Sequence, residues 1–87
     1  MTHRTDIEGF KSVADLAEAV GNLRYDALRD FFKALEAKMK KDAKADDRRG
    51  RERLAYRLDL TSCCLHDAAC EVDEAWDICE PYMKDKP

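Results

Sequence analysis

Three residues in the second half of this 87-residue chain have side chains that can ligate a metal ion. Cys63, His66 and Cys70 are spaced i, i+3 and i+7, so on a helix they share one face. One straight helix cannot surround a tetrahedral ion, so a further ligand would have to come from His3 or from a second copy. The alternative is that reduced cysteines pack as small apolar side chains. A metal or redox sensor is therefore one candidate function, and no cofactor is expected.

Acidic residues of the same segment form a second group, with helical spacing: Asp67, Glu71, Glu74 and Asp77. Carboxylates in a helical bundle can bind metal when an ExxH motif accompanies them, and no such motif occurs here. An acidic helix face can also imitate the spacing of phosphates and compete with nucleic acid for a basic groove. We take this face as the candidate partner-binding surface, and a solvated acidic face is the alternative.

A basic cluster lies in the middle of the chain and indicates a possible anion-binding site at Arg48, Arg49, Arg51 and Arg53. Arginines at a turn can bind phosphates of nucleic acid or of a nucleotide. No aromatic residue lies between positions 33 and 55, so base stacking by this segment is not expected. The alternative is a solvated turn of mixed charge.

The motifs of common catalytic sites are missing from the sequence. Ser12 and Ser62 do not lie in a GxSxG context, and the three glycines are too far apart to form a phosphate-binding loop. We therefore expect no catalytic residues and a protein that is not an enzyme.

The composition predicts an all-α fold in a single domain covering residues 1–87. Apolar residues make up 45% of the chain and charged residues 40%, with only three glycines and two prolines. The net charge of −3 is unevenly distributed: residues 21–57 carry twelve basic and seven acidic side chains, whereas residues 58–87 carry two and eight. The molecule is therefore electrostatically polarised.

Apolar periodicity predicts a short N-terminal helix followed by a long antiparallel helical hairpin. Gly21 is expected to end the first helix, Asn22 to cap the second, Gly50 to form the turn and Pro81 to stop the third. An unbroken helix through Gly50 is the alternative. The expected segments are an irregular lead-in at 1–11, helices at 13–20, 22–49 and 51–80, and a tail at 81–87.

Two apolar stripes position these helices. One arc of the second helix carries Leu28, Phe31, Phe32, Leu35 and Met39. The arc then continues with Asp42 and Asp46, so the last turns of this helix should be solvated. The third helix carries a stripe with heptad spacing at Leu54, Leu58, Thr61, Leu65, Ala68, Val72, Ala75 and Cys79. We expect the first helix to close the open end of the hairpin against Trp76 and Cys79.

The third helix has a second set of apolar residues on the face opposite its stripe, at Tyr56, Leu60, Cys63, Cys70 and Ile78. A monomeric hairpin would expose them, so we expect them to form an oligomer interface, most simply that of a dimer with four long helices. Isolated exposed apolar residues are the alternative.

These features favour a non-enzymatic interaction protein. Small acidic helical proteins often act as stoichiometric inhibitors or adaptors, as many phage accessory proteins do, and a protein partner is therefore expected. Nucleic-acid or nucleotide binding through the basic turn is the alternative. No apolar run has the length of a membrane span and the N-terminus has no apolar signal segment, so we expect no membrane contact and a cytoplasmic location.

Overall fold

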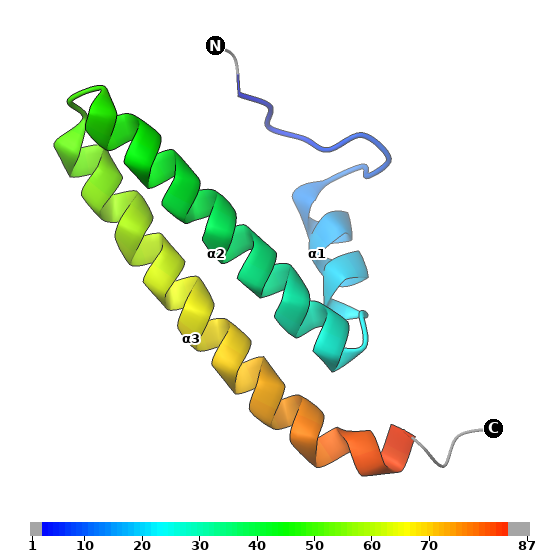
Figure 1. The fold of residues 1–87 in the computed structure, drawn as a ribbon. Coiled ribbons are helices and arrows are strands. Elements are labelled where there is room, and N and C mark those ends of the chain that lie inside the picture. The colour runs from blue at the N-terminus through cyan, green and yellow to red at the C-terminus, as the bar shows by residue number, and fades with distance from the viewer. Residues whose placement is uncertain (1–2, 84–87) are drawn as a thin grey trace.

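The computed structural model describes residues 3–83, which contain three helices and no strand. They are α1 (Val13–Gly21), α2 (Tyr25–Arg48) and α3 (Glu52–Met83). The predicted all-α class is confirmed. Figure 1 shows that α3 returns alongside α2 from the turn that joins them, so the two long helices form the body of the molecule. We refer to these two helices as the α2–α3 pair.

The buried side of α3 is lined by unusually small side chains. Ala55, Ser62 and Ala69 are buried and recur every seven residues, whereas Leu54 is 46% exposed and Thr61 is also exposed. The predicted stripe was therefore wrong at Leu54 and Thr61, whereas its residues Ala68 and Ala75 are half-buried. Both sets share the residues Leu58, Leu65, Val72 and Cys79, and both have heptad spacing. The small set lies inward because α2 contributes the large side chains, and small residues opposite them fill the space between the backbones without overlap.

The seam of α2 contains Leu28, Phe32, Leu35 and Met39, all half-buried, and extends to the end of the helix. The expectation that its last turns would be solvated was wrong, because Ala43 and Asp46 are buried. Asp46 is tolerated there because its Oδ1 accepts a hydrogen bond from Nη1 of Arg51 across the turn, at 3.1 Å. A buried carboxylate with a charged donor avoids most of the cost of losing water.

The turn at residues 49–51 ends α2 by a Schellman motif. Gly50 has a φ of +79°, a conformation that favours glycine. The Gly50 N–H donates to the Asp47 carbonyl at 3.0 Å, and the Arg51 N–H donates to the Asp46 carbonyl at 2.8 Å. The chain therefore reverses at the glycine that the sequence indicated.

The first helix begins as expected and ends differently. The Ser12 hydroxyl accepts a hydrogen bond from the Asp15 N–H at 3.1 Å, which caps α1. Gly21 belongs to α1 and has no positive φ, and Asn22 takes the C-cap position instead of opening α2. The reason is that the Asn22 N–H donates to the Glu18 carbonyl, so the backbone of α1 continues one residue further. The second helix then starts at Tyr25 and not at Asn22.

The end of the α2–α3 pair is closed by the linker between α1 and α2, and not by α1 as expected. The guanidinium of Arg24 lies over the Trp76 ring, 5.3 Å from its centroid. Residues 21–25 line a shallow pocket together with Cys79 and Met83. Of α1, only its last residue, Gly21, lines this pocket, and Val13 at its start remains 67% exposed.

The prediction that Pro81 stops the third helix was wrong, since α3 continues through it to Met83. Proline removes one backbone donor and disturbs the preceding turn, but the helix on its C-terminal side can continue for a few residues. Figure 1 shows the axis of α3 changing direction over its last turns, as a proline bend does. Of the expected tail at 81–87, residues 84–87 lie outside the described part of the chain.

Candidate functional site

The outer side of α3 carries a row of four exposed carboxylates, which we call the acidic row: Asp67, Glu71, Glu74 and Asp77. The 3.6-residue period of the helix places the row on the side turned away from the buried residues Ser62 and Ala69. Ten residues separate its ends, which corresponds to about 15 Å along the helix axis. One rigid helix therefore holds the four groups on its outer side, spread over about 120° of its circumference.

No hydrogen bond or ion pair within residues 3–83 involves a side chain of the acidic row. The neighbouring acids toward α2 differ in this respect. Asp73 accepts from Nη1 of Arg29 at 2.7 Å. Glu36 pairs with Nζ of Lys40 at 3.0 Å, and the hydrogen bond from Lys40 lowers the pKa of the Glu36 carboxyl. The acids at the helix contact are thus internally neutralised, whereas the outward row is not.

Other acids of α2 are also neutralised by local partners. Arg24 donates two hydrogen bonds to Asp26, at 2.7 and 2.8 Å, and these lower the pKa of the Asp26 carboxyl. Lys38 contacts both oxygens of Asp42 at 2.6 Å. Single exposed acids elsewhere, such as Glu18, Asp47 and Asp59, also have no ion pair within residues 3–83, but the acidic row brings four such carboxylates together on one side of α3.

The four arginines of the predicted anion site, Arg48, Arg49, Arg51 and Arg53, are all exposed around the turn. Arg51 is occupied by Asp46, as described above. Beside the turn lies an open groove of about 710 Å³, and within it Lys38 and Asp42 also form an ion pair. Arg49 is the arginine of this groove for which no carboxylate partner is found in the described residues. The turn therefore offers less free positive charge than its composition indicated.

The predicted metal ligands Cys63, His66 and Cys70 do lie near one another. Sγ of Cys70 is 3.8 Å from Nε2 of His66, and Nδ1 of His66 is 3.4 Å from Oε1 of Glu36. However, within residues 3–83 no group of three or more His, Cys, Asp or Glu side chains is arranged to hold a metal ion. All four cysteines are free thiols.

The predicted oligomer-interface residues are all exposed in the single chain. Tyr56 is 60% exposed, Leu60 37% and Ile78 72%, and Cys63 and Cys70 are exposed as well. The guanidinium of Arg57 lies 5.8 Å from the centre of the Tyr56 ring. These residues interleave with the acidic row on the same outer side of α3, so the two predicted surfaces overlap.

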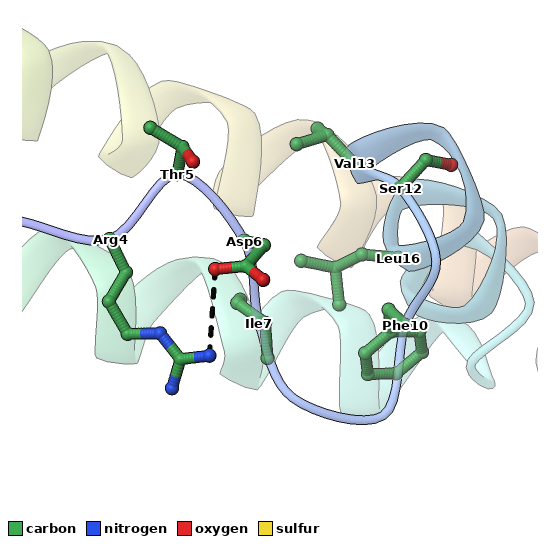
Figure 2. A pocket seen from close by; sticks show the side chains of 8 residues that line it. All are labelled: Arg4, Thr5, Asp6, Ile7, Phe10, Ser12, Val13 and Leu16. Atoms are coloured by element: carbon green, nitrogen blue, oxygen red, sulfur yellow. Dashed lines mark hydrogen bonds and ion pairs between the residues drawn. The ribbon is translucent and has the colours of Figure 1, made fainter.

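The sequence analysis did not foresee a pocket at the N-terminal segment. Ile7, Phe10 and Leu16 line a hollow of about 190 Å³ between residues 4–7 and the start of α1. Figure 2 shows these side chains. Gly9, with a φ of +95°, allows the segment to fold back, and the Phe10 N–H donates to the Ile7 carbonyl at 3.1 Å. Gly9, which lies between Ile7 and Phe10, was the feature of the sequence that could have indicated this turn. The pocket is small and its ion pair, Arg4 with Asp6, is exposed.

The two serines considered for catalysis have structural roles. Ser12 caps α1, and Ser62 is fully buried and donates to the Asp59 carbonyl at 2.6 Å. In the part of the chain that the structure describes, no helix has both the length and the apolar character of a membrane span. Comparison with protein-family models, with curated proteins and with solved structures finds no match to this chain.

Proposed function

We propose that this protein is a non-enzymatic interaction protein that binds a basic surface of a macromolecular partner through the acidic row. The observation that carries the proposal is the contrast between carboxylates. Those at the contact of α2 and α3 have basic partners, whereas the four outward carboxylates have none within residues 3–83. Exposed charge with no internal partner is available for a complementary surface.

The spacing of the row favours a groove that otherwise accepts nucleic acid. Four carboxylates over about 15 Å give one charge per 5 Å, compared with one phosphate per 3.4 Å of axis on a single DNA strand. A basic protein groove that neutralises a strand can therefore also accept the row. In this function the chain acts as a stoichiometric inhibitor or adaptor, and it needs no cofactor.

The test is comparative capture from a native lysate of the source organism with three forms of the protein. One form is wild type, and one carries Asp67→Asn, Glu71→Gln, Glu74→Gln and Asp77→Asn. The matched control carries the same loss of four charges at other exposed acids: Glu8→Gln, Glu18→Gln, Asp47→Asn and Asp59→Asn.

We expect wild type and the control variant to capture the same nucleic-acid-binding protein. The row variant should not capture it. The purified partner should then bind in a fixed stoichiometry and lose its affinity for nucleic acid in proportion to the complex formed. Equal capture by all three forms would show that the acidic row is not the binding surface.

Nucleic-acid binding by the turn is the second candidate. It is supported by Arg48, Arg49 and Arg53, which are exposed and have no ion pair within residues 3–83. A gel-shift titration at low salt should then show binding that is lost on replacing these three arginines by glutamine. A wild-type protein that shifts no DNA or RNA under those conditions would eliminate this function.

A further inference from the structure

The chain exposes more surface than a folded monomer of its size usually does. Its accessible surface is 7204 Å². Folded monomers of 10.0 kDa expose about 5,200 Å². The difference, roughly 2,000 Å², exceeds the ~800 Å² that each partner contributes to a standard protein interface. Since the buried apolar residues of the α2–α3 pair are only Ala43, Ala55 and Ala69, association can add apolar burial that the single chain lacks.

The outer side of α3 has a second row with the same spacing as its buried seam. We call it the outer seam, and its residues recur at steps of four and three: Tyr56, Leu60, Cys63, Asp67, Cys70, Glu74 and Asp77. All seven are exposed. Repeated steps of four and three are the pattern by which one helix packs along another. Three apolar residues of the outer seam, Tyr56, Leu60 and Cys63, precede Asp67, and a fourth, Cys70, follows it.

The charges of this side determine which occupant fits. Arg53 and Arg57 lie at the N-terminal end of the outer seam, on either side of Tyr56, and Glu71 and Asp77 lie at its C-terminal end. Arg53 and Arg57 have no ion pair in the described range. A surface that is basic at one end and acidic at the other is complementary to itself when one copy is reversed.

We propose that two copies of this chain pack with the outer seams of their α3 helices antiparallel about a two-fold axis near residue 65. In this register Leu60 lies opposite Cys70 of the second copy, and Tyr56 lies opposite Glu74 of the second copy. Arg53 then faces Asp77 of the second copy, and Arg57 faces Glu71 of the second copy. By symmetry the dimer has four such charge pairs.

Other arrangements of the same two helices fit less well. A parallel pairing places Asp67, Glu74 and Asp77 opposite their own copies, which is repulsive. An antiparallel pairing shifted by seven residues places Leu60 opposite Asp77 and leaves Arg57 opposite Ile78. The register with its axis near residue 65 is the one that joins Leu60 to an apolar residue and both arginines to acids.

This dimer uses the same side of α3 as the proposed function. All four residues of the acidic row lie in the dimer contact, since Asp67, Glu74 and Asp77 belong to the outer seam and Glu71 forms a charge pair. A basic partner therefore has to displace the second copy before it can use the whole row. The dimer is tested on the protein alone, so a monomeric wild type overturns the dimer and leaves the capture experiment intact.

The first measurement is the molar mass in solution by sedimentation equilibrium. Wild type should have about twice the 10.0 kDa of one chain. Leu60→Glu places a charge in the interface twice, and we expect it to weaken the dimer by about 100-fold or more. The matched control is Leu54→Glu, the same change at another exposed leucine of α3, which should leave the dimer intact. Circular dichroism confirms that both variants are helical.

The second measurement fixes the direction of packing. Replacing Leu60 by cysteine, together with Cys63, Cys64 and Cys79 by serine, leaves thiols at positions 60 and 70 only. Oxidation with diamide should link position 60 of one copy to position 70 of the other, as found by peptide mapping. Links of 60 to 60 and 70 to 70 indicate parallel packing and overturn the proposal. A wild-type protein that is monomeric at 100 µM, or a Leu60→Glu variant that dimerises like wild type, also overturns it.

Discussion

Replacement of Ser62 by leucine tests the packing of the α2–α3 pair most sharply. Ser62 is fully buried, with its hydroxyl donating to the Asp59 carbonyl, and it occupies the centre of the small-residue seam. Leucine adds two heavy atoms where no open space exists. Overpacking of this kind costs about 1–3 kcal/mol, and the larger value applies where two backbones lie close. We expect a loss of about 2 kcal/mol in the free energy of unfolding.

The matched control is Thr61→Leu, one residue earlier on the same helix. Thr61 is exposed and its hydroxyl donates to the Arg57 carbonyl at 2.9 Å. Leucine there meets solvent and has a better helix propensity, so the change should lie within about 0.5 kcal/mol of wild type. Ser62→Ala removes only a hydroxyl bound within its own helix, and it should be neutral or slightly stabilising.

The assay is thermal unfolding followed by circular dichroism at a fixed protein concentration. For a chain of this length 1 kcal/mol corresponds to about 4–8 °C, so Ser62→Leu should lower Tm by about 8–16 °C. Thr61→Leu should change Tm by no more than about 4 °C. If Thr61→Leu is the damaging change and Ser62→Leu is tolerated, the buried seam is the one that includes Leu54 and Thr61, and the packing described above is wrong.

Two further changes test the turn and the paired carboxylates. Gly50→Ala forces an L-residue to a φ of +79° and should cost about 1 kcal/mol of stability, whereas Gly9→Ala, at a positive φ outside the pair, should leave the unfolding midpoint of the pair unchanged. Lys40 lowers the pKa of Glu36 below its ordinary value of 4.5, so this contribution to stability is present above pH 4.5 and is lost as the pH falls through the lowered pKa. Urea midpoints measured from about pH 6 to pH 2.5 should therefore fall less steeply for Glu36→Gln than for Glu8→Gln, and equal slopes would contradict the assignment.

The all-α class and the turn at Gly50 follow from local chemistry. Few glycines, helix-favouring residues and one glycine between two amphipathic segments suffice to indicate them. The solvated position of Asp67 and Glu71 follows in the same way, because the helical period places them away from the apolar stripe.

The seam itself could not be determined from the spacing. The set with Leu54 and Thr61 and the set with Ala55 and Ser62 have identical periods, and hydrophobicity alone favours the first. The choice depends on what α2 presents at the contact, which is tertiary information. The burial of Asp46 has a similar origin, since the donor that neutralises it comes from the other side of the turn.

The helix ends show the limits of residue-by-residue signals. Asn22 is suited to cap the start of α2, but it closes α1 because the hydrogen bond to the Glu18 carbonyl is available one residue earlier. Pro81 removes one donor without removing the remaining helical bonds, so α3 continues to Met83. In both cases the position of the helix end depends on hydrogen bonds of neighbouring backbone groups, which the residue type does not indicate.

Binding by the acidic row can be tested by measuring the affinity of the protein for a defined probe. The probe is a fluorescent peptide with lysines at eight alternate positions. An exposed ion pair contributes about 0.5 kcal/mol, so loss of four pairs corresponds to about 2 kcal/mol, or roughly 30-fold in Kd. Fluorescence anisotropy at low salt should show this weakening for the variant neutralised at Asp67, Glu71, Glu74 and Asp77. The control neutralised at Glu8, Glu18, Asp47 and Asp59 should bind within about threefold of wild type. Equal weakening of both variants would show that only net charge matters, and would contradict a binding surface on α3.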